Sequence, residues 1–193
     1  MAAALPAARY EIDCRRTRIV VHTGTEGILS PLAHDLEIEA HPINGTARDL
    51  GTSWTATVMI AKRDLRVVGA LKRGRVDAKV LSDKDRGEIE RRIYDEALGF
   101  TREFTVTANG GPRNGEVSIP RARGDAFVVP MQFGRLASIT SDVTVEGSCE
   151  LSLRAMGVGD VRGPLGAFRV ADRVYVTFTA VWKLVTPGAA TPR

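Results

Sequence analysis

The alternation of apolar and polar residues near the end of the chain constrains the fold more than any other feature. From Arg173 onward, every second position is apolar, namely Val174, Val176, Phe178, Ala180 and Trp182. Because successive side chains of a β-strand point to opposite sides, this period places the whole set on one face. A slip of one residue in the pairing would turn all five toward solvent, so the pattern also fixes the register.

Similar alternation recurs along most of the chain. A second clear stretch, with Val143, Val145, Cys149 and Leu151 on one face, covers residues 143–153. Shorter stretches lie at 19–23, 36–40, 54–60, 76–80, 104–108, 117–119 and 127–133. Gly and Pro residues separate these runs and mark turns. We therefore predict an all-β chain of eight or more antiparallel strands.

A single segment, 83–98, has the period of a helix instead. Ile89, Ile93 and Ala97 recur every four residues, while charged residues such as Arg92 are assigned to the opposite, solvated face. Ser82, with an acidic residue three positions later, forms a capping-box signal for the start of a helix. We predict one inserted helix over about Asp83–Leu98, docked on the strands through its narrow apolar stripe.

Strands with one apolar face each must bury that face, either in a sandwich of two sheets or in a closed barrel. The apolar faces here mix bulky residues such as Trp54 and Phe104 with small ones such as Ala56 and Ala180. Small residues enlarge the interior of a barrel of about eight strands, which then has room for one small ligand. The pattern favours a closed antiparallel barrel, with a filled sandwich as the alternative.

The 193 residues suit one domain, which we place at 9–184, with disordered tails at 1–8 and 185–193. The content of 44% hydrophobic and 26% charged residues excludes a wholly disordered chain. No run of 18 apolar residues is present, which argues against a membrane-spanning helix. The first residues lack the features of a secretory signal, so the expected compartment is the cytoplasm. Cys14 and Cys149 are accordingly expected to be free thiols.

The net charge of +4 is spread along the chain. Basic residues cluster between Lys62 and Arg75, around a predicted exposed loop at 61–75. No aromatic residue that could stack on a base lies between 55 and 93. We therefore expect no nucleic-acid partner. The cluster is a solvated loop in the simplest interpretation. In the sharper one, Arg63 and Arg66 form a cationic rim that meets an anionic head group.

Motifs for catalysis are missing from the sequence. It contains no nucleophile elbow, no phosphate-binding loop and no dinucleotide fingerprint. Carboxylate pairs such as Glu37 and Glu39 are assigned to solvated strand faces. His34 and Asp35 are adjacent on a strand and point to opposite faces, so they are poorly placed to hold one ion. We expect no enzymatic activity, no cofactor and no metal site, and a polar role for His34 at the barrel mouth.

Several segments, taken together, resemble a known family. They are Tyr10-Glu-Ile-Asp13, the stretch 27–38 with Ala33-His34-Asp35-Leu36, the helix start at 83–90, the stretch 163–168, and Val174-Tyr-Val-Thr-Phe178. They are similar to the YceI-like family of lipocalin-like barrels that bind lipids and polyisoprenoids, over about residues 9–184. The resemblance implies an extended, lipocalin-like antiparallel barrel of eight strands with a helix near one opening. It also implies an apolar interior for a long isoprenoid or fatty chain.

The predicted function is therefore non-catalytic transport or storage of one long-chain apolar ligand, an isoprenoid or a fatty lipid, and a homodimer is left open. The alternative is an interaction domain with a filled interior, in which the loops 61–75 and 109–135 contact another protein. A connected apolar cavity of about 300 Å³ or more would favour ligand storage. The residues predicted to bind the ligand are Leu36, Ile38, Trp54, Val58, Ile60, Phe104, Val106, Leu151, Val176, Phe178 and Trp182.

Overall fold

The computed structural model describes residues 8–27, 34–49, 53–99, 101–139, 142–162 and 169–185. The predicted tails, the motif residue Ala33 and the stretch 163–168 lie almost wholly outside these ranges. The strands are β1 (Arg9–Ile12), β2 (Arg18–Thr23), β3 (Thr25–Glu26), β4 (Asp35–Ala40), β5 (Asn44–Arg48), β6 (Trp54–Ala61), β7 (Arg66–Lys72), β8 (Arg75–Asp77), β9 (Glu103–Gly110), β10 (Asn114–Ile119), β11 (Phe127–Ile139), β12 (Asp142–Ser152), β13 (Arg169–Val170) and β14 (Arg173–Leu184).

Eight of these strands form a closed antiparallel ring in the order β1-β5-β6-β9-β10-β11-β12-β14. The ring closes because β1 pairs with β14, with Tyr10 opposite Leu184 and Ile12 opposite Trp182. A β-bulge near Phe133 and Arg135 bends β11 against β12, as is common where barrel strands curve. The prediction of an eight-stranded antiparallel barrel is confirmed, and a sandwich of two sheets is not formed.

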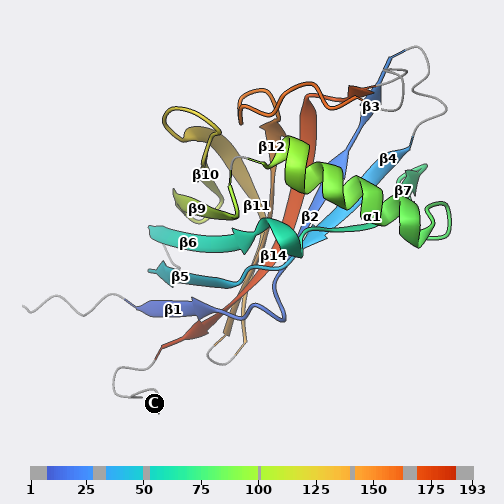
Figure 1. Cartoon of the computed structure of the whole chain (residues 1–193). Coiled ribbons are helices and arrows are strands. Elements are labelled where there is room, and N and C mark those ends of the chain that lie inside the picture. Colours follow the sequence, from blue (N-terminus) through green and yellow to red (C-terminus); the bar gives the residue numbers. More distant parts are fainter. Residues whose placement is uncertain are drawn as a thin grey trace, which may run out of the picture.

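Four further strands, β2, β4, β7 and the short β8, prolong the ring into an open extension. The long strand β14 pairs with β2 along its first half and with β1 along its second half. In the same way, β4 continues into β5 after a break at 41–43, and β6 continues into β7 after a short 3-10 turn at Lys62–Asp64. Figure 1 shows this extension of β2, β4 and β7 rising beyond the ring, with the helix crossing over it.

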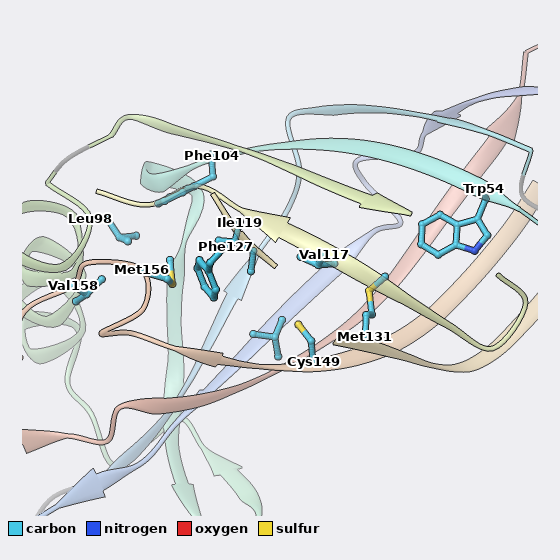
Figure 2. Close-up of a cluster of buried hydrophobic side chains, with 11 residues drawn as sticks. Trp54, Leu98, Phe104, Val117, Ile119, Phe127, Met131, Cys149, Met156 and Val158 are labelled. Carbon is cyan, nitrogen blue, oxygen red and sulfur yellow. The ribbon is translucent and has the colours of Figure 1, made fainter. Parts of the chain in front are cut away.

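The alternation predicted the orientation of the side chains correctly. The five apolar residues of β14 all face the interior, as do Ile19 and Val21 on β2. Buried side chains gather in two clusters. The large cluster, drawn in Figure 2, consists of Trp54, Leu98, Phe104, Val117, Ile119, Phe127, Met131, Cys149, Met156, Val158 and Val176. The small cluster, near the closure of the ring, consists of Ala47, Val143, Val145, Ala180 and Trp182.

Two predictions about strands are wrong. The expected strand at 76–80 is only the three-residue β8, which is followed by a turn. Val76 in β8 and Val80 after it are each 38% exposed. The expected loop at 61–75 contains β7, whose Val67 and Ala70 are buried. The flanking basic residues obscured this strand in the sequence. A β-bulge between β4 and β7 also interrupts the register there.

The predicted helix is confirmed as α1 (Asp83–Arg92), which continues into a π-helical turn at Ile93–Ala97. Its start is the expected capping box, in which the Ser82 hydroxyl accepts from the Asp85 amide at 3.2 Å. The carboxylate of Asp85 in turn accepts from the Ser82 amide at 3.1 Å. The Ser82 hydroxyl also donates to this carboxylate at 2.6 Å, and this bond, followed by the one from the Ser82 amide, lowers the pKa of Asp85. Within the described residues, no helix has the length and hydropathy needed to cross a membrane.

Replacement of Ser82 by Ala is expected to lower the free energy of unfolding by about 1 kcal/mol, because it removes the helix N-cap. Urea denaturation followed by circular dichroism measures this change. Ser53→Ala, at an exposed position before β6, is the control and should change stability by less than about 0.5 kcal/mol. Equal stability of the two variants would contradict a stabilising role for the cap.

Candidate functional site

The interior of the barrel contains one large cavity with a volume of about 690 Å³. Its wall is almost entirely apolar and comes from the inner faces of the ring, the extension and α1. The cavity therefore runs from the closed ring to the space beneath the helix. Its volume lies within the range of small-molecule sites, about 300–1,000 Å³. The interior is therefore hollow, and the alternative prediction of a filled interior is wrong.

The predicted ligand-binding residues converge on this cavity. All eleven positions, from Leu36 on β4 to Trp182 on β14, contribute to its wall. They share the inward phase of their strands, which is why the alternation alone could find them. Their contact with a ligand stays a prediction.

The helix completes the wall on the side of the extension. Ile89, Ile93 and Ala97 all line the cavity, as their spacing predicted. The assignment of Arg92 to the solvated face is wrong, because this residue also lines the cavity. It follows Ile89 by three residues, which brings the two side chains to neighbouring positions on one helix face.

A polar mouth, defined here as His34, Asp85, Glu88, Arg92 and Arg162, forms one end of the cavity. Four of these residues are exposed, and Arg92 is half-buried. The guanidinium of Arg92 pairs with Glu96 at 3.2 Å and donates to the carbonyl oxygen of Arg162 at 2.7 Å. His34 was predicted at the mouth, whereas the other four residues were not, because the mouth joins segments far apart in the chain.

The proposed head-group residues Arg63 and Arg66 lie elsewhere, at the corner between β6 and β7, and do not contribute to the cavity wall. The guanidinium of Arg66 donates to the carbonyl oxygens of Arg63 and Leu65 and to the hydroxyl of Tyr94, the last at 2.6 Å. These bonds attach the corner to the helical segment. A role of either arginine toward a head group stays a prediction.

The other two histidines, His22 and His41, contact the carboxylates of Glu37 and Glu39 on the outer face of β2 and β4. The ring nitrogen Nε2 of His22 lies 2.8 Å from Glu37, and Arg18 binds both Glu37 and Glu39. The assignment of Glu37 to a solvated face is wrong, because Glu37 is only 8% exposed beneath these partners. No cluster of three or more metal-binding side chains occurs in the part of the chain that the structure describes.

Both cysteines are free thiols, as expected. Cys149 lines the cavity, and burial raises its pKa to about 11. A thiol with this pKa is almost entirely protonated at neutral pH and reacts slowly, because the thiolate is the nucleophile. Cys149 is therefore a built-in reporter of the cavity.

In a Cys14→Ser variant, modification of Cys149 by a thiol reagent is expected to accelerate roughly tenfold per pH unit between pH 7 and 9, because the thiolate fraction rises with pH below the pKa. A fatty or isoprenoid ligand in the cavity should slow this reaction further. The reaction is followed by absorbance, with the unfolded protein as the control. Modification of the folded protein as fast as that of the unfolded protein would contradict the burial of this thiol.

Comparison with known proteins defines the class of fold. No protein-family model and no curated protein matches the chain. Its structure is similar to the crystal structure of BcnA from Burkholderia cenocepacia, with a TM-score of 0.52 and 14% sequence identity. The match covers 88% of this chain and 98% of that chain. At this level of identity the likeness shows that the chain shares its fold with BcnA.

Proposed function

We propose that this protein is a non-catalytic binding protein that holds one long-chain apolar ligand, a polyisoprenoid or a fatty lipid, for transport or storage. The observation that carries the proposal is the cavity of about 690 Å³ with its almost wholly apolar wall. Each methylene group transferred from water into such an environment contributes about 0.8 kcal/mol. A chain of many such groups therefore supplies the affinity without a specific polar contact.

The proposed ligand lies with its hydrocarbon chain along the cavity and its polar end at the mouth. Apolar side chains of α1 and the strands enclose the chain, whereas the exposed side chains of the mouth, such as Glu88 and Arg162, meet solvent. A polar head group left in water avoids the cost of burial without hydrogen bonds. This arrangement requires no chemistry on the ligand.

The helical segment is attached more firmly along one edge than along the other. On the side of the β6–β7 corner, the Lys62 ammonium donates to the carbonyl of Tyr94 at 2.7 Å, and the Tyr94 hydroxyl donates to the carbonyl of Leu65 at 2.6 Å. The Val67 amide also donates to Glu90 at 2.9 Å. On the mouth side, the bond from Arg92 to Arg162 joins the helix to the loop after β12. We infer that the helix acts as a lid that opens at the mouth.

Replacement of Arg92 by Met is expected to accelerate ligand release about threefold to tenfold, because it removes one hydrogen bond across the mouth, worth about 1 kcal/mol. Stopped-flow displacement of a fluorescent fatty acid measures the release rate. Arg91→Met, at the exposed neighbouring position, is the matched control and should release at the native rate. Equal rates in the two variants would contradict the lid.

Native mass spectrometry of the protein isolated from its natural source is the direct test of the proposed function. A retained lipid with the mass of an isoprenoid or a fatty compound is expected. The delipidated protein should then bind a labelled fatty acid or isoprenoid alcohol saturably at micromolar concentrations. No retained lipid, together with no saturable binding at tens of micromolar, would contradict the proposal and favour the interaction domain.

A further inference from the structure

Three aromatic side chains lie at the boundary between the two buried clusters. Phe133 on β11 and Phe178 on β14 each pack against both the large and the small cluster. Trp54 on β6 belongs to the large cluster and meets Phe133 edge to face, with ring centroids 5.1 Å apart. Figure 2 shows Trp54 at one end of the large cluster, beyond Met131. We call Trp54, Phe133 and Phe178 the aromatic waist.

Gly147 on β12 lies between the two phenylalanines. It is directly opposite Phe133 on one neighbouring strand and directly opposite Phe178 on the other. A Cβ atom added to Gly147 would lie 2.5 Å from the Cζ atom of Phe178 and 2.7 Å from the carbonyl oxygen of Gln132. The ring of Phe178 thus rests on the bare backbone of Gly147, a close approach that no other residue permits.

The ring of Trp54 also packs against glycine backbone, as the ring of Phe178 does. A Cβ atom added to Gly110 or Gly115 would lie 2.9 or 3.0 Å from the Cζ2 atom of Trp54. The indole nitrogen of Trp54 donates to the carbonyl oxygen of Gly111 at 2.8 Å. The rings of Phe178 and Trp54 therefore rest on glycine backbone, which cannot move aside as a flexible side chain could.

The cavity continues on both sides of the aromatic waist. Leu98, Met131 and Cys149 of the large cluster line it on one side, and Val145, Ala180 and Trp182 of the small cluster line it on the other. Three residues of the mouth, Asp85, Glu88 and Arg92, belong to α1, whereas Trp182 of the small cluster lies at the closure of the ring. An apolar chain that enters at the mouth must therefore pass the waist to fill the far end.

We propose that Phe178, seated on Gly147, determines which chains the cavity accepts, by limiting the length and width of hydrocarbon that reaches the far end. This inference rests on the proposed function. Straight chains long enough to pass the ring gain contacts with the small cluster, and chains with methyl branches are held back at the waist. The residue that sets the limit is Phe178, and Gly147 is its positioning residue.

The test is a binding series of laurate, palmitate, arachidate and geranylgeraniol against the delipidated protein. In the native protein, affinity for the straight chains is expected to rise by up to about fourfold per added methylene, the equivalent of about 0.8 kcal/mol. In Gly147→Ala, the new methyl group pushes the Phe178 ring into the passage. The affinity for laurate is then retained, while the gain from laurate to arachidate falls at least tenfold.

Phe178→Ala tests the inference in the opposite direction and does not depend on the glycine. It opens the waist, so geranylgeraniol, with its branches, should gain at least tenfold relative to palmitate. Gly87→Ala is the matched control for the glycine substitution, because a Cβ atom there meets nothing within 4 Å. It should leave the whole series unchanged.

The outcomes separate the two proposals. If the native protein binds none of the four compounds, the proposed function fails. If it binds them but the folded Phe178→Ala and Gly147→Ala variants keep the native order of affinities, the waist is not the selecting feature and the function stands. If Gly147→Ala does not fold, Phe178→Ala and Phe178→Leu decide the question alone, and native selectivity in both overturns the inference.

Discussion

Replacement of Ala56 by Trp is expected to abolish lipid binding while leaving the barrel folded. Ala56 lies on the inner face of β6, opposite Ala47 and Ala108 on the neighbouring strands, and it lines the cavity. An indole at this position would project into the space that the proposed ligand fills. Overpacking typically costs about 1–3 kcal/mol, which is less than the usual stability of a domain of about 5–15 kcal/mol.

Thr55→Trp is the matched control, because Thr55 is the preceding residue of β6 and points outward into solvent. Titration with a fluorescent fatty acid should show at least a hundredfold loss of affinity for Ala56→Trp and native affinity for Thr55→Trp. Ala180→Phe should reproduce the loss from the opposite wall. Native affinity in both inward variants would show that the ligand binds outside the cavity.

Replacement of Trp182 by Ala is expected to lower the free energy of unfolding by about 3–5 kcal/mol, the largest stability effect we predict for one substitution. Trp182 is only 4% exposed and belongs to the small cluster. It pairs with Ile12 on one side and Val143 on the other, at the place where the ring closes. Its loss would leave a void where the first and last strands of the ring meet.

Chemical denaturation measures this effect, with Tyr175→Ala on the same strand as control. Tyr175 is 49% exposed, so its replacement should change stability by less than about 0.5 kcal/mol. Phe178→Ala should fall between the two, because Phe178 is only partly buried and its ring is smaller than the indole of Trp182. A loss below about 1 kcal/mol for Trp182→Ala would contradict the packing described for the closure.

The class of fold and the inner wall were predictable because they depend on local pattern. The alternation from Val174 to Trp182 determines which side chains face inward whatever the partners of the strand are. The helix was predictable because the capping box at Ser82 and the spacing from Ile89 to Ala97 are also local signals. The inward-facing side chains and the helix were both predicted correctly without knowledge of any long-range contact.

The remaining features could not be predicted because they depend on small residues or distant partners. On β5, the inward residues are Gly45 and Ala47, which carry too little hydrophobicity to reveal a strand. The mouth combines the side chains of Glu88 and Arg162, which no sequence period relates. Glu37 is covered by Arg18 and His22 from the neighbouring strand. The local alternation does not contain these partners, so it predicted a solvated residue.

The pairing of β1 with β14 has a consequence for folding during synthesis on the ribosome. The strand that completes the ring belongs to the last described segment, while its partner β1 belongs to the first. During synthesis, one edge of β1 therefore stays unpaired until β14 has emerged. Barrels with such distant contacts fold slowly, because a long loop has to close before the contacts form. The nascent chain is thus most vulnerable to aggregation just before β14 is released, and a chaperone would act in that interval.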